Sequence, residues 1–274
     1  MPINLLCVGD VVGKPGKGML ADHLRELIQQ RQIELVICNA ENVAGGSGLT
    51  PQLFQKLLHY GVDVVTLGDH VFRRVEIVQA MSGPQGDRLV RPANMSPAAA
   101  GRGWTAVRTK SGQHLVGVTC LLGQMYMGYA NSPWQGVDEV LAAMPAEAKV
   151  RVVDFHADAS SEKIAMGWHL AGRVSVVFGT HTHTPTADAR VLDGGTAFIS
   201  DVGMTGPYDS VLGRKKERVL SYLTTAMPTP FHVADGDPRL CGLLAAVDPD
   251  SGKALSVERI DIRGRTTADG ADDD

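Results

Sequence analysis

Short apolar segments alternate with amphipathic segments over the first two hundred residues. This alternation is expected of strand and helix units built around a sheet. Each apolar run has strand length, and the run over residues 3–8 is interpreted as a buried strand. The predicted strands are residues 3–8, 35–39, 62–67, 150–155, 174–178 and 197–200.

The amphipathic segments predict helices. Apolar residues recur at helical spacing in residues 19–28 and again in residues 53–58, and residues 162–170 have a similar pattern. Thr50 and Pro51 have the sequence of an N-cap followed by proline at the first helical position, so a helix is predicted to begin there.

Antiparallel hairpins are predicted in the middle of the chain and near its end. One joins residues 104–109 to 114–120, and another joins 240–247 to 254–262. Residues 122–137 are predicted as a loop near the mouth of the functional site. Parallel units combined with hairpins predict an α/β fold in which two sheets pack face to face between helices.

The composition favours one folded domain. Of 274 residues, 44% are hydrophobic and 20% are charged, which permits a sizeable core. We expect a domain over residues 1–265 and a polar, acidic, disordered tail over 266–274. The net charge of −4 argues against general nucleic-acid binding and membrane-surface binding.

The cysteines and the amino terminus favour a cytoplasmic protein. The four cysteines have no Cys-x-x-Cys spacing, which excludes a zinc ribbon or a thioredoxin motif. The first apolar run is too short for a signal sequence, and the sequence contains no run of transmembrane length.

Polar residues that can bind metal ions follow five of the predicted strands. In α/β proteins the carboxyl ends of strands are where ligands bind. A single such residue is usually a turn or a helix cap, but five successive strand ends form a pattern. These residues are Asp10, Glu41, Asn42, Asp69, His70, His156, His181 and His183.

The residue types favour transition metals. Imidazole and carboxylate ligands suit zinc, iron or manganese, whereas an all-oxygen set would suit magnesium or calcium. These candidate ligands are too many for one tetrahedral ion and fit two ions that share a carboxylate. If His181-Thr182-His183 is extended, both rings lie on one side of the chain.

Other catalytic patterns are not supported. The glycine-rich segment 44–48 does not end in Gly-Lys-Ser/Thr, so it is interpreted as a loop and not as a phosphate-binding loop. The sequence has no Gly-x-Ser-x-Gly elbow, which disfavours a serine hydrolase. The remaining histidines lie in helical, hairpin or loop patterns and are interpreted as ordinary.

The order of these motifs resembles that of the calcineurin-like metallophosphoesterases. More narrowly, the sequence resembles the bacterial YmdB-type branch over about residues 3 to 214. The resemblance implies a four-layer α/β/β/α sandwich, two metal ions, and hydrolysis of cyclic nucleotide phosphodiesters. The stretches that carry it are residues 9–13, 39–42, 68–70, 154–163, 179–188 and 201–207.

The resemblance also implies roles for individual residues. Asp10 and His183 would hold one metal ion, and Glu41 would bridge the two ions where most of these enzymes use aspartate. A hydroxide on the metals would be the nucleophile, because metal binding lowers the pKa of water.

The second metal ion would be held by Asp69, His156 and His181. His70 would be the general acid for the leaving ribose oxygen, and Asn42 would contact metal or phosphate. The family usually has asparagine where this chain has Asp69, which adds a charge and removes an amide donor.

We therefore expect a dinuclear phosphodiesterase acting on a 2′,3′- or 3′,5′-cyclic nucleotide, with iron or manganese favoured and zinc compatible. Two alternatives stay open. One is a catalytically weak metal-binding regulatory protein that acts through a partner, for which Asp69 is the argument. The other is a phosphomonoesterase. A homo-oligomer is compatible with the sequence.

Overall fold

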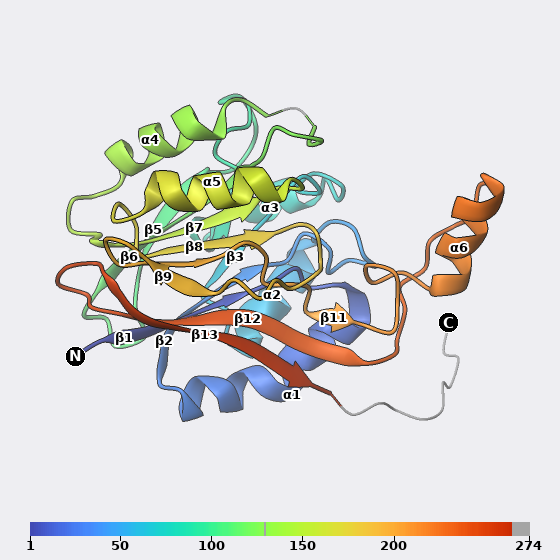
Figure 1. The fold of residues 1–274 in the computed structure, drawn as a ribbon, viewed down its shortest axis with the longest axis horizontal. Coiled ribbons are helices and arrows are strands. Elements are labelled where there is room, and N and C mark those ends of the chain that lie inside the picture. The colour runs from blue at the N-terminus through green and yellow to red at the C-terminus, as the bar shows by residue number, and fades with distance from the viewer. Residues whose placement is uncertain (129, 265–274) are drawn as a thin grey trace.

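The computed structural model describes residues 1–128 and 130–264. These residues form two sheets that pack face to face, with helices on the outer face of each (Figure 1). The predicted four-layer α/β/β/α sandwich is confirmed. The predicted acidic tail, 266–274, lies outside the described residues.

The first sheet is built mainly from the amino-terminal third of the chain and closed by the last hairpin. In the described ranges its strands are β1 (Ile3–Val8), β2 (Ile33–Asn39), β3 (Val64–Thr66), β4 (Leu89–Val90), β11 (Gly206–Pro207), β12 (Pro238–Val247) and β13 (Ala254–Arg263). β1 to β4 are parallel neighbours, and β12 runs antiparallel to β1. Its outer face packs against α1 (Gly13–Gln30), α2 (Pro51–Tyr60) and α3 (Ile77–Met81).

The second sheet comes from the middle of the chain. Its described strands are β5 (Trp104–Arg108), β6 (Leu115–Leu122), β7 (Val150–His156), β8 (Val176–Thr180), β9 (Arg190–Leu192) and β10 (Thr196–Ile199). β6, β7, β8 and β10 are parallel, whereas β5 and β9 run antiparallel at the edges. Helices α4 (Pro133–Ala143) and α5 (Ser160–Leu170) cover its outer face.

Two further helices lie outside the four layers. A 3-10 helix, Gly86–Arg88, precedes β4, and α6 (Lys216–Thr225) projects from the body with only Val219 buried (Figure 1). Within the described ranges, no helix has both the length and the apolar character needed to cross a membrane.

Strand β1 shows why the predicted strands are mostly apolar. Leu5 and Cys7 face the second sheet, whereas Leu6 and Val8 face the helices. Successive side chains of a strand point to opposite faces, so a strand buried on both faces needs apolar residues throughout. The polar residues that follow these strands are therefore departures from a well-defined pattern.

The predicted start of α2 is confirmed. The similar start signal of α4 was overlooked in the sequence. The Thr50 hydroxyl accepts a hydrogen bond from Leu53 N, with Pro51 at the first helical position. Ser132 and Pro133 repeat this arrangement at the start of α4. The prediction of a loop over 122–137 was therefore wrong from Pro133 onward, because the Ser-Pro cap was not recognised.

Candidate metal centre

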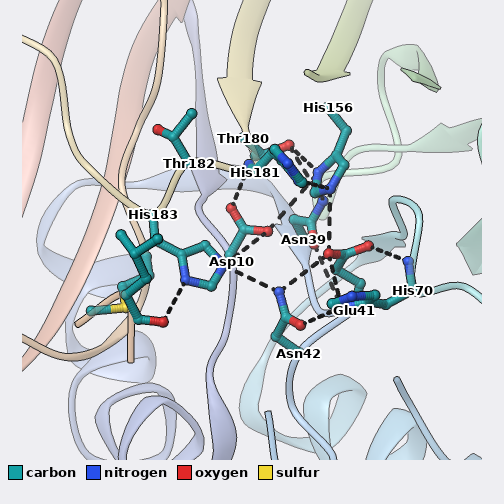
Figure 2. A network of polar contacts seen from close by, with 12 residues as sticks. Asp10, Asn39, Glu41, Asn42, His70, His156, Thr180, His181, Thr182 and His183 are labelled. Atoms are coloured by element: carbon teal, nitrogen blue, oxygen red, sulfur yellow. Dashed lines mark hydrogen bonds and ion pairs between the residues drawn. The ribbon is translucent and has the colours of Figure 1, made fainter. Parts of the chain in front are cut away.

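The eight residues predicted at strand ends converge on one edge of the molecule. Strands β1, β2 and β3 of the first sheet and β7 and β8 of the second sheet all end there. Figure 2 shows Asp10 between His183 and His181, with Glu41, Asn42 and His70 on the neighbouring side. The two sheets thus contribute side chains to one site.

Four residues form a compact group, named here the four-residue cluster: Glu41, Asp69, His156 and His181. Each offers one ligand atom, and these atoms lie within 4.8 Å of one another. His156 Nε2 lies 3.1 Å from Asp69 Oδ1 and 3.3 Å from Glu41 Oε1. Two carboxylates and two imidazoles in this arrangement are a donor set that transition metals favour.

Asp10, Asn42 and His183 form a second group, named here the Asp10 group. His183 Nδ1 donates to the carbonyl of Leu212, so Nε2 carries the lone pair and accepts from Asn42 Nδ2 at 3.2 Å. Asp10 Oδ1 lies 4.0 Å from His183 Nε2. The second oxygen of Asp10 accepts a hydrogen bond from His181 N.

One oxygen of Asp10 provides a direct test of whether a metal ion fits. Asp10 is fully buried, and its Oδ1 has no hydrogen-bond partner in the described part of the chain. A buried carboxylate oxygen without a donor is costly unless a cation accompanies it. The residues present therefore fit a metal ion beside Asp10 Oδ1 and His183 Nε2.

Glu41 contacts both groups. Its Oε1 lies 3.2 Å from Asn42 Nδ2 and 3.3 Å from His156 Nε2, and its Oε2 accepts from His70 N at 2.9 Å. The close approach of these side chains requires glycine at residue 68, because a Cβ atom there would lie 2.2 Å from His156 and 2.5 Å from Glu41.

His70 lies at the accessible side of the site. Its Nδ1 lies 2.7 Å from Asn42 Oδ1, an acceptor, so Nδ1 carries a hydrogen. Nε2 lies 3.7 Å from Asp69 Oδ2, and about a quarter of the side chain is exposed. The ring is therefore held by Asn42 while its Nε2 remains within reach of a bound molecule.

The ionisable groups of the four-residue cluster shift one another's pKa values. Burial alone would raise the pKa of Glu41, but the adjacent His156 ring outweighs it and the pKa is lowered. Burial would lower the pKa of His156, yet Glu41 and Asp69 raise it well above its ordinary value. A metal ion at this position must therefore compete with a proton for the lone pair of His156 Nε2.

The two neighbouring histidines do not have the extended geometry predicted for them. β8 ends at Thr180, and His181 and His183 have φ values of 97° and 63°, in the left-handed region. Their rings therefore reach different groups: His181 Nδ1 lies 3.1 Å from His156 Nε2, whereas His183 contacts Asn42. The extended backbone on which that prediction rested is absent, although both rings reach the site.

A buried polar network behind His156 was missed from the sequence. His156 Nδ1 donates to Thr180 Oγ1 at 2.8 Å, and that hydroxyl donates to Asp154 Oδ1 at 2.7 Å. Thr66 Oγ1 and Asn39 Nδ2 donate to the other oxygen of Asp154. This chain directs His156 Nε2 toward the cluster, as metal-ligating histidines require. Burial raises the pKa of Asp154 to about 6 despite the opposing effect of His156.

The loop after β6 begins next to the site. Gly123 N donates to the carbonyl of His156 at 3.0 Å, and the backbone N–H groups of Gln124 and Met125 donate to the Glu162 carboxylate. Residues 123–125 are therefore fixed to the strand and helix that flank His156.

Comparison of the sequence with known proteins identifies a matching family. The sequence model of the YmdB-like protein family matches residues 6–260. A Bacillus subtilis (strain 168) protein named 2′,3′-cyclic-nucleotide 2′-phosphodiesterase is 39% identical over 258 residues, covering 94% of this chain and 96% of that protein.

Two solved structures are also similar over nearly the whole chain. A hypothetical protein from Thermus thermophilus has a TM-score of 0.89 at 33% identity, covering 96% of this chain and 100% of that one. A Mycoplasma pneumoniae structure described as a novel phosphatase has a TM-score of 0.88 at 31% identity, covering 96% and 94%.

Proposed function

Because the chain belongs to the YmdB-like protein family, we propose that this metal-dependent phosphoesterase hydrolyses a cyclic nucleotide phosphodiester at a dinuclear metal centre. The observation that carries the proposal is the pairing of two ligand groups through one buried carboxylate, Glu41. The unpartnered oxygen of Asp10 supports a cation in the second group as well.

The ligand groups suggest how two ions would be held. Asp10 and His183 would hold one ion, the four-residue cluster would hold the other, and Glu41 would contact both. Iron or manganese suits this mixture of imidazoles and carboxylates. When bound, two such ions would lower the pKa of a water molecule and offset the charge of the phosphate.

His70 and Asn42 would act on the substrate. Asn42 Oδ1 fixes the His70 ring through Nδ1. The ring can then hold a second proton at Nε2 and deliver it to the leaving ribose oxygen. Asn42 would orient His70 through Oδ1, and its Nδ2 would release His183 Nε2 once that nitrogen holds a metal ion.

A 2′,3′-cyclic nucleotide is the proposed substrate, because the Bacillus subtilis relative is named for that activity. We expect about two transition-metal ions per chain by elemental analysis, and turnover that disappears on chelation and returns with manganese or iron. The assay should include 2′,3′- and 3′,5′-cyclic nucleotides and phosphomonoesters.

The outcomes separate the alternatives. Protein that contains no transition metal and turns over without it would contradict the metal centre. Protein that binds metal but cleaves none of the substrates would favour a regulatory protein of the same fold. Cleavage of monoesters alone would favour a phosphomonoesterase.

Asp69 marks the departure from the family pattern, and Asp69→Asn tests its effect. Asparagine removes a negative charge that lies 3.1 Å from His156 Nε2, so more metal should be needed for half-maximal rate. Its amide can donate to a phosphate oxygen, and a single such donor is worth about 10²–10³ in kcat in well-studied enzymes. We expect turnover at saturating metal to rise roughly tenfold.

The comparison requires a full metal titration of both proteins, so that metal occupancy and chemistry are separated. A fall in turnover at full occupancy would mean that aspartate suits this site, and the explanation of the departure would be wrong.

A further inference from the structure

A buried ion pair lies behind the loop that carries His181 and His183. Lys163 on α5 and Asp201 after β10 are joined by Nζ and Oδ2 at 2.6 Å, and their side chains are 3% and 2% exposed. Removing two charges from water is costly, and apolar residues of similar size often stabilise a fold as well or better. A packing role alone therefore does not account for this pair.

Both members of the pair bind the loop next to His181. Lys163 Nζ donates to the carbonyl of Thr180 at 2.8 Å, immediately before the histidine. Asp201 Oδ2 accepts from the N–H and the hydroxyl of Thr182 at 3.2 and 2.8 Å, immediately after it. Asp201 Oδ1 accepts from Gly203 N, which fixes the carboxylate itself.

These anchors hold an unusual backbone. Residues other than glycine rarely have the positive φ values of His181 and His183, and such conformations persist only where the surroundings fix them. The Thr182 side chain binds Asp201, behind the loop. The rings of His181 and His183, on either side of Thr182, point toward the site. His181 then reaches the four-residue cluster and His183 reaches the Asp10 group.

We propose that the Lys163–Asp201 pair is a positioning device that orients His181 and His183 toward two different metal ions and thereby sets metal affinity. The inference rests on the proposed dinuclear centre. It assigns Lys163, Asp201 and Thr182 an effect on metal binding although none of them is a proposed ligand. Partners that orient metal ligands typically contribute 10–100-fold to affinity.

The test is calorimetric titration of metal-free protein with manganese, together with the melting temperature of each metal-free variant. Asp201→Asn removes the charge that holds Lys163 and one strong acceptor for Thr182. Thr182→Val removes only the hydroxyl donor and leaves the ion pair intact. We expect Asp201→Asn to lose about 10–100-fold in manganese affinity and Thr182→Val to lose less.

Two controls match these variants. Thr182→Ser retains the hydroxyl and should bind manganese like the wild type. Asp138→Asn changes a carboxylate of α4 that pairs with Arg173 on the outer side of the second sheet, away from the histidine loop. Its manganese affinity should be unchanged even if its melting temperature falls.

The outcomes are distinguishable. Wild-type affinity in both Asp201→Asn and Thr182→Val would overturn the positioning role while leaving the metal centre intact. If Asp201→Asn does not fold, the contrast between Thr182→Val and Thr182→Ser still decides the question. Wild-type protein that binds no manganese would overturn the proposed centre and this inference with it.

Discussion

Glu41→Gln is expected to abolish most turnover and to weaken binding of both metal ions. Glu41 is fully buried, and its Oε1 faces both ligand groups. Glutamine preserves the shape but removes the charge shared between the ions. A metal ion supplies several kcal/mol of transition-state stabilisation, and each 1.36 kcal/mol is tenfold in rate. The loss should therefore be roughly 10³-fold or more.

Elemental analysis and turnover should be measured on the same preparations. Glu139→Gln is a matched control, because Glu139 is an exposed residue of α4, a helix on the outer face of the second sheet. That variant should keep full metal content and rate. A Glu41→Gln protein that retains two ions and most of its turnover would contradict the shared role of this carboxylate.

The fold was largely predictable because local patterns and tertiary structure agree. Both-face burial of the central strands requires continuous apolar runs, and these runs placed the strands within a few residues. The Thr50 cap marked α2 in the same direct way. Helix α4 was not predicted, because its N-cap lies within a segment whose glycine and aromatic residues suggested a loop. Helix α6 has little buried surface and gave no clear periodic signal.

The sequence predicted which residues meet at this edge, but not the geometry in which they meet. Parallel strands place their carboxyl ends at one edge, so polar residues after those strands were expected to meet, and they do. The left-handed backbone of His181 and His183 depends on contacts with Asp201, which is distant in sequence. No local pattern encodes such a contact. The same holds for Asp154 and its partners on β3 and β8.

His70→Ala is expected to retain both metal ions and to lose roughly 10²–10⁴-fold in rate on a cyclic nucleotide. The backbone N–H of residue 70, which donates to Glu41 Oε2, survives the substitution. The side chain lies 3.5 Å from Glu41 Oε1 and 3.7 Å from Asp69 Oδ2, but it is partly exposed and is not a proposed ligand, so both ions should be retained. The substitution removes the proton carrier at Nε2 together with the hydrogen bond from Nδ1 to Asn42.

The leaving group distinguishes an acid from a positioning residue. A nitrophenyl phosphodiester releases a stable anion that needs little protonation, so its hydrolysis should fall much less in His70→Ala than that of a cyclic nucleotide. His59→Ala, which changes an exposed histidine on α2, should leave both rates unchanged. If His70→Ala keeps its full metal content and loses the same factor in rate on both substrates, the ring acts through Asn42 on the position of the phosphate. In that case the proton must reach the leaving oxygen from another group or from water.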